Sequence, residues 1–115
     1  MNLQDFFAGL HLDSSGVLAR FGNNEALLEK FLKRFPSDPN WPLLEKAVKE
    51  KNFEDANIAA HTLKGLCLNL GLTSLAELFQ SICLDARQKD GTLLEQDFAL
   101  AEQEYQDIVA QISLL

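Results

Sequence analysis

The sequence predicts an all-α protein in which four main helices form an antiparallel, up-and-down bundle, with short accessory helices capping one end from the N-terminal side. Apolar residues recur three and four positions apart along almost the whole chain, which is the spacing of amphipathic helices. Runs of β-branched residues are absent, and glycine and proline stand between the periodic segments. Helices that each carry one apolar face are best buried against one another, so residues 1–115 are expected to form a single domain.

The N-terminal segment predicts two short helices. The first spans about Leu3 to Ala8 and ends at the turn GLHLD. The second begins at Asp13, a residue type favoured as an N-cap, and stops at FGNN. Gly22 ends this second helix, and Asn23 or Asn24 caps the next one.

The following two helices are separated by a break that contains prolines. The first is predicted from about Glu25 to Phe35, where PSDPNWP ends it, and the second from about Trp41 to Lys51. Their expected apolar stripes are Leu27, Leu28, Phe31, Leu32 and Phe35 in the first helix, and Leu43, Leu44, Ala47 and Val48 in the second.

The central helix is predicted from Phe53 to Leu70, with Asn52 as its N-cap. Gly71 follows at the position where a left-handed residue commonly ends a helix. On a helical wheel one wide stripe is apolar and is assigned to the core. That stripe consists of Ala56, Ala59, Ala60, Leu63, Leu66, Cys67 and Leu70.

Two more helices complete the chain. Thr73 or Ser74 opens the first of them, which continues to the turn QKDG. The segment TLLE, Thr92 to Glu95, fits a capping box in which the threonine hydroxyl and the glutamate carboxylate each accept from a free backbone amide. It is expected to open the last helix, which ends near Leu115.

Charge and composition argue against several classes of partner. The net charge is -7 and only 10 residues are Lys or Arg, whereas nucleic-acid sites require clustered basic residues. No apolar run approaches the roughly 20 residues that span a bilayer, and the opening MNLQDFFAGLHLD lacks the basic start of a secretory signal. We therefore expect a cytoplasmic protein that binds neither nucleic acid nor membrane, and the initiating Met favours a free-standing chain.

Neither the cysteines nor the carboxylates indicate a catalytic or metal site. Cys67 and Cys83 lie in apolar helical segments without CxxC spacing, which is typical of buried free thiols. The carboxylates are spread along the outer helix faces, so we interpret them as solvated and not as an acid/base pair. His11 has no companion ligand and is interpreted as structural or incidental. Phosphate-binding glycine loops are absent, which excludes an autonomous kinase.

The outward face of the central helix contains a glycine, Gly65, at a position where glycine destabilises a helix. This face carries Asn57, Ile58, His61, Lys64, Gly65 and Leu68. Gly65 costs about 1 kcal/mol relative to alanine inside a helix, yet it adds nothing to the core. The missing side chain leaves room beside His61, and Lys64 adds a positive charge suited to an anion there. An exposed imidazole is largely neutral at pH 7, as a nucleophile must be, so the arrangement suggests phosphate chemistry.

The segment AAHTLKGLCLNLGLTSL resembles the signature of the histidine-containing phosphotransfer (HPt) domain family, the relay modules of multistep two-component phosphorelays. The shared features are HxxKG and a glycine at the tenth residue after the histidine. Upstream, LDSSGVLARFGNNEALLEKFLKRF and AVKEKNFEDANIAAHTLKG also resemble family segments, so the likeness covers almost the whole chain. The resemblance implies a four-helix bundle with accessory N-terminal helices.

The resemblance also implies roles for three residues. His61 would be the phosphoacceptor, Lys64 would steady the phosphoryl charge, and Gly65 would keep the approach clear. Receiver (response-regulator) domains, such as those of hybrid histidine kinases, would be the partners and would bring Mg²⁺ and most of the transition-state stabilisation. The chain would then be a phosphocarrier and not an enzyme on its own, without a cofactor, and it is expected to be monomeric.

One position departs from the family pattern, because Leu68 stands where a small residue is usual. Leu68 either adds to an apolar docking patch with Ile58, which we favour, or narrows access to His61 and changes which receiver fits. Asn57, on the same face, is also assigned to receiver docking. An accessory helix that covers Ile58 and Leu68 is a further competing interpretation. Gly65 as a packing glycine and Lys64 as an ordinary solvated charge are also alternatives.

Two other functions compete with phosphotransfer. The first is an HPt-like interaction protein that binds or sequesters a receiver without being phosphorylated. The second is a small all-α enzyme, which would need charged groups converging on the apolar core stripes.

Overall fold

The regular structure of the chain is helical throughout residues 1–12 and 14–115, which the computed structural model describes. Asp13, the expected cap of the second short helix, lies outside the described residues. The elements are α1 (Leu3–Gly9), α2 (Ser15–Arg20), α3 (Glu25–Arg34), the 3-10 turn η1 (Phe35–Ser37), α4 (Asn40–Glu50), α5 (Phe53–Asn69), α6 (Thr73–Arg87) and α7 (Gly91–Ile112). The all-α prediction is confirmed.

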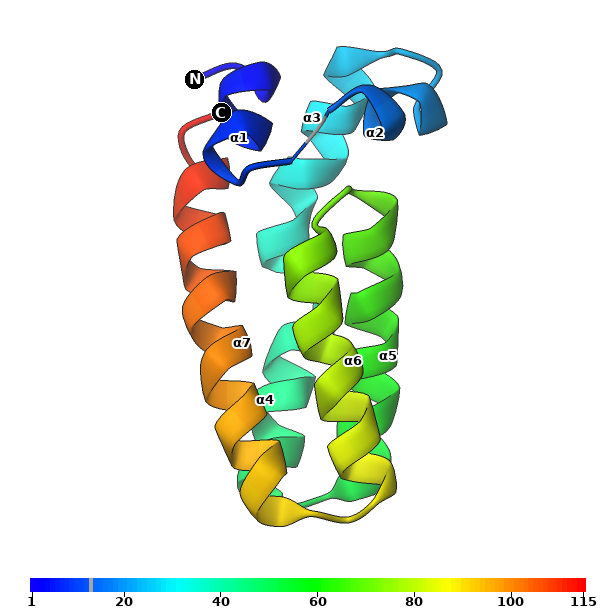
Figure 1. The fold of residues 1–115 in the computed structure, drawn as a ribbon, viewed down its shortest axis with the longest axis vertical. Coiled ribbons are helices and arrows are strands. Elements are labelled where there is room, and N and C mark those ends of the chain that lie inside the picture. The colour runs from blue at the N-terminus through cyan, green and yellow to red at the C-terminus, as the bar shows by residue number, and fades with distance from the viewer. Residues whose placement is uncertain (13) are drawn as a thin grey trace.

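Four of these helices close into a ring. Helix α5 packs between α4 and α6, and α7 packs against α6 and touches α4. Consecutive members α4 to α7 run in opposite directions along the long axis, and α1 and α2 cover the end where α5 gives way to α6 (Figure 1). The accessory helices therefore lie at one end of the bundle, as the sequence predicts.

Side-chain caps set several of the helix starts. The Oδ1 atom of Asn24 accepts a hydrogen bond from the backbone N–H of Leu27 at 3.1 Å, and Asn52 caps α5 in the same way. The predicted capping box at Thr92–Glu95 is wrong. Helix α7 begins at Gly91 because the carboxylate of Asp90 accepts from the Leu93 N–H at 3.0 Å. Aspartate is the stronger cap, and it precedes the threonine along the chain.

The core stripe of α4 differs from the prediction at one position. Leu43 is 56% exposed, whereas Trp41, Leu44, Ala47 and Val48 are buried. The Trp41 ring fixes the rotation of the helix, since it stacks on Tyr105 of α7 with centroids 4.0 Å apart. A rotation that buried Leu43 would withdraw this indole from the core.

Gly71 joins the accessory helices to the bundle. Its φ of +77° confirms the left-handed position predicted after α5. Val17 of α2 and Phe7 of α1 also pack directly on it, and a Cβ atom built there would overlap Val17 Cγ2 and lie 3.4 Å from the Phe7 ring. The glycine is therefore required twice, by its backbone conformation and by the close approach of α2.

Candidate functional site

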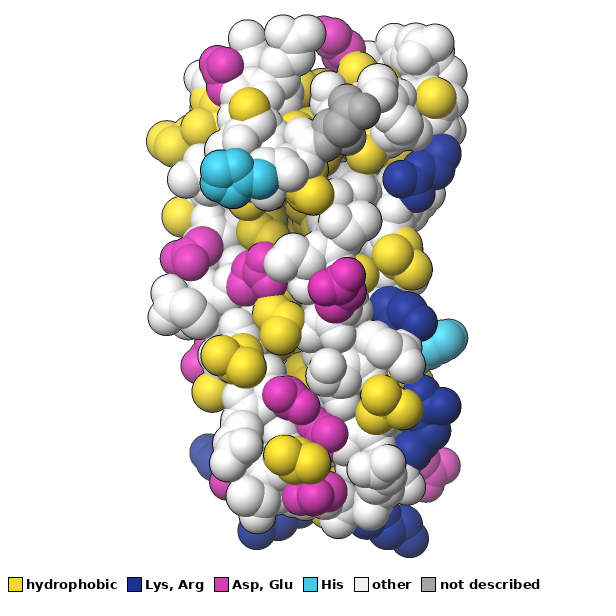
Figure 2. Space-filling view, in the orientation of Figure 1, with side chains coloured by type: hydrophobic (Ala, Val, Ile, Leu, Met, Phe, Trp, Pro, Cys, Tyr) yellow, Lys and Arg dark blue, Asp and Glu magenta, His cyan; other side chains and the backbone are white. Residues whose placement is uncertain are grey.

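His61 projects from the outward face of α5. On the core side of α5, Ala60 and Leu63 are fully buried, whereas His61 is exposed. Figure 2 shows Lys and Arg side chains gathered along the edge formed by α5 and α6, with a histidine projecting among them. The packing of α5 thus leaves the imidazole open to a partner, as the helical wheel predicts.

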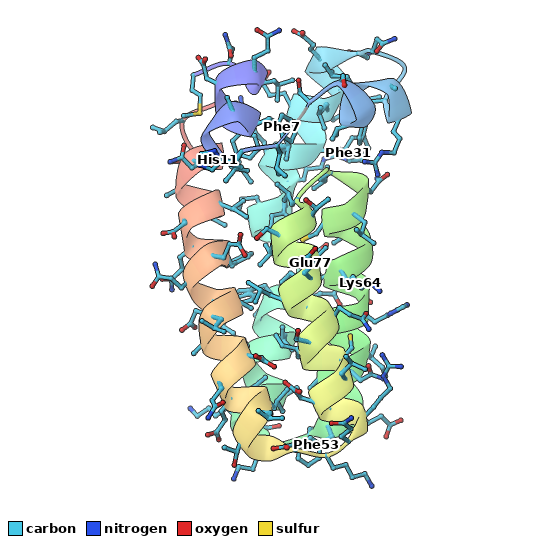
Figure 3. All side chains as sticks on the ribbon, in the orientation of Figure 1. Phe7, His11, Phe31, Phe53, Lys64 and Glu77 are labelled. Carbon is cyan, nitrogen blue, oxygen red and sulfur yellow. The ribbon has the colours of Figure 1, made fainter. Side chains whose placement is uncertain are left out.

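Lys64 is held by the neighbouring helix. Its Nζ donates a hydrogen bond to Oε1 of Gln80 on α6 at 2.7 Å, and the lysine is half-buried. Figure 3 shows Lys64 projecting from the outer side of α5. Lys64 follows His61 by about one helical turn of α5, and its ammonium group is held by α6, which favours a positioned charge over an ordinary solvated one. Gln80 was not identified from the sequence.

Gly65 faces open space. No atom beyond the local helix lies within 4 Å of the position that its Cβ would occupy, and the residue is exposed. The alternative of a packing glycine is therefore excluded. The clearance lies about one turn of α5 beyond His61, at the residue that follows Lys64.

An apolar surface borders the histidine. Ile58 is 57% exposed and Leu68 is 42% exposed, so no accessory helix covers them and that competing interpretation is wrong. Leu84 of α6 is 46% exposed and was not identified from the sequence. Arg20 of α2 donates a hydrogen bond to the Leu68 carbonyl oxygen, which places a further cation at the upper border of this surface.

The lower border of the same surface is set by a contact between α5 and α6. The carbonyl oxygen of Asn57 accepts from the Cys83 thiol at 3.7 Å, and Arg87 Nε donates to the Cys83 carbonyl oxygen at 3.4 Å. Burial raises the pKa of the Cys83 thiol, while the charges of Arg87 and Lys64 oppose that rise. Both cations are therefore near this contact, in a protein whose net charge is -7.

We name this region the His61 face. It comprises Ile58, His61, Lys64, Gly65 and Leu68 of α5, Gln80, Leu84 and Arg87 of α6, and Arg20 of α2.

The other titratable candidates do not join the His61 face. Cys67 and Cys83 are buried free thiols, as predicted, and burial raises the pKa of Cys67, which keeps it protonated and unreactive. His11 lies beside α1, at the side of α7 (Figure 3). Within the described residues, no group of His, Cys, Asp or Glu is arranged to hold a metal ion.

The interpretation of all carboxylates as solvated is wrong at one position. Asp85 of α6 is 6% exposed and faces the interior. The rest of the core among the described residues is apolar. An enzyme site in the interior would have to be built around this single buried carboxylate.

Comparison with known proteins gives one match. The sequence model described as "Hpt domain" matches residues 26–113, a span that holds nearly the whole His61 face. No curated protein and no solved structure matches the chain. A search of the described helices finds none that is long and apolar enough to cross a membrane.

Proposed function

We propose, because the chain belongs to the Hpt domain family of histidine phosphotransfer modules, that His61 is the residue that accepts and passes on the phosphoryl group. The observation that carries this proposal is the combination at one place of an exposed imidazole, an anchored ammonium group and an open glycine position. His11, the other histidine of the chain, lacks these neighbours, since it lies beside α1 near Leu12 and Glu104.

The proposed transfer requires only that an unprotonated imidazole nitrogen reach the phosphorus atom of a receiver's aspartyl phosphate. The N–P bond forms while the bond between phosphorus and the carboxylate oxygen breaks, and the aspartate leaves as a carboxylate. The other imidazole nitrogen then releases its proton to solvent. Donation to a second receiver follows the same steps in reverse, and the receivers supply Mg²⁺ and most of the charge stabilisation.

Lys64 and Gln80 give the phosphoryl group a fixed positive neighbour. The hydrogen bond to Gln80 holds the Lys64 ammonium group before transfer, so little side-chain freedom is lost when an anion arrives beside it. Gly65 leaves space for the receiver surface and for the phosphoryl oxygens.

The apolar residues of the His61 face are proposed to dock the receiver. Ile58 and Leu68 are exposed on the helix that carries His61, Leu84 is exposed on α6, and Arg20 and Arg87 contribute cations from α2 and α6. A small apolar centre with a charged rim is typical of transient protein contacts. Ile58 also borders a groove of about 270 Å³ between α4 and α5, which offers further apolar surface next to the site.

The test is phosphoryl transfer from a panel of phosphorylated receiver domains with Mg²⁺. The native protein should acquire an acid-labile, alkali-stable label, which is the behaviour of phosphohistidine. His61→Gln should remain folded, because the side chain is exposed, and should take up no label. His11→Asn is the matched control and should be labelled normally, since asparagine tolerates the positive φ at that position.

Two results would overturn the assignment. Labelling of the His61→Gln variant at the native level would place the phosphoryl group elsewhere. No label from any receiver, together with a folded bundle and measurable receiver binding, would instead support the interaction protein that binds a receiver without transfer.

A further inference from the structure

Asp85 is an exception in the core. It lies on α6 at the end of the bundle opposite α1 and α2, is 6% exposed, and is the one buried charged residue among those described. Its Oδ2 atom has no hydrogen-bond partner. A buried carboxylate oxygen without a partner is strongly disfavoured, so either a proton or a cation must compensate it.

The charged groups that act on Asp85 most strongly are carboxylates. The carboxyl group of Asp97 on α7 lies within hydrogen-bonding reach, and Asp90 in the turn adds a second negative charge. Lys51, in the turn between α4 and α5, is exposed and its side chain lies against Gly91, and Lys89 is exposed in the turn between α6 and α7.

The helices that flank this pair present apolar side chains to the core. These are Ala56 and Ala59 of α5 and Ala47 and Val48 of α4. No arrangement of His, Cys, Asp and Glu in the described residues suits a metal ion. A proton is therefore the remaining compensating charge.

Two ionised carboxylates cannot hydrogen-bond to each other, because both are acceptors only. A single proton between them changes this, since the protonated group donates to the ionised one and the orphaned oxygen is satisfied. Burial, the hydrogen bond and negative charge of Asp97, and the negative charge of Asp90 together raise the pKa of Asp85 to about 7. Because the two carboxyl groups share one proton, the loss of that proton as the pH rises is a property of the pair and not of either residue alone.

We propose that Asp85 and Asp97 share one proton and form a pH-sensitive clamp that joins α6 to α7 at the turn between them. In the protonated state one hydrogen bond connects the two helices. In the deprotonated state two like charges face each other at a buried position, and this end of the bundle is loosened.

The sign of the effect follows from proton linkage. The unfolded chain releases the proton near the ordinary aspartate pKa of 3.8, whereas the folded chain keeps it up to a pKa of about 7. Folding therefore takes up a proton between these values. The folding equilibrium constant should fall about tenfold for each pH unit between roughly pH 5 and 7. Above that window the stability contributed by the bound proton is fully lost.

The first test is urea unfolding of the full chain at pH 5, 6, 7 and 8. The native protein should lose stability as the pH rises. Asp97→Asn and Asp85→Asn should flatten that dependence and should be more stable than the native protein at pH 8, since an amide can donate to the remaining carboxylate. Asp107→Asn removes the same charge from an exposed position of α7 and should retain the native slope.

The second test is direct observation of the carboxyl carbon of Asp85 by NMR during a pH titration of the native protein. A midpoint of Asp85 near pH 7 is expected. A midpoint of Asp85 below pH 5 would overturn the proposal. So would an Asp97→Asn variant with the native pH dependence, and because Asp97 is only half-buried this variant is expected to fold even if Asp85→Asn does not.

Discussion

Replacing Gly71 by alanine should destabilise the protein by an amount that can be divided into two parts. The backbone part arises because φ is +77°, a conformation that costs a residue with a Cβ about 1–2 kcal/mol. The packing part arises because the new methyl group would overlap Val17 Cγ2, and relieving such an overlap in a packed core costs about 1–3 kcal/mol. Alanine also restricts the unfolded chain more than glycine does, which stabilises the folded state by about 0.4–1 kcal/mol. The net loss should be about 1–5 kcal/mol.

The assay is urea unfolding followed by helical circular dichroism, with Gly65→Ala as the matched control. The same substitution at Gly65 meets open space within a helix, so it should leave stability unchanged or raise it by about 0.5–1 kcal/mol. The two glycine-to-alanine changes should therefore have opposite signs.

A double-mutant cycle separates the two parts of the cost. In a Val17→Ala background the overlap is removed, so Gly71→Ala should cost only its backbone part, about 1 kcal/mol. An equal cost of Gly71→Ala in both backgrounds would refute the packing argument. A cost near zero in the native background would refute both parts.

Two further predictions concern the His61 face. Gln80→Leu should leave the fold intact but slow phosphoryl transfer by about 2- to 10-fold. The reason is that Lys64 loses a hydrogen bond worth roughly 0.5–1.5 kcal/mol. An unchanged initial transfer rate would contradict the role of Gln80. Leu84→Ala should weaken receiver binding by about 5-fold, measured by calorimetry, as expected for a side chain at the border of a contact. Leu100→Ala removes a more exposed leucine on α7; it is the control and should bind normally. Equal losses in both variants would argue against docking at the His61 face.

Local sequence signals predicted the elements of the site well. A cap such as Asn52 acts within three residues of itself, and the helical period alone separates the outward His61 from the inward Leu63. The error at Thr92 shows where such signals fail. Two cap-like residues stood in the same turn, and the stronger acceptor, Asp90, began the helix.

Contacts between helices could not be predicted in the same way. The helical period shows which face of α6 carries Gln80, but not whether that residue lies level with Lys64 or a turn away from it. That level depends on how both helices rotate and slide as their core side chains interlock. Leu43 illustrates the same limit, since the stacking of Trp41 on Tyr105 decided the rotation of α4.

The sequence by itself determined the helical class, the outward face of α5 with His61 and the left-handed turn at Gly71, because each of these depends on residues within a few positions of one another. The tertiary structure alone decided which residues from distant parts of the chain meet. It brought Gln80 to Lys64, Val17 onto Gly71 and Asp97 to Asp85. Each of these pairs joins two elements whose relative position results from the packing of the whole core.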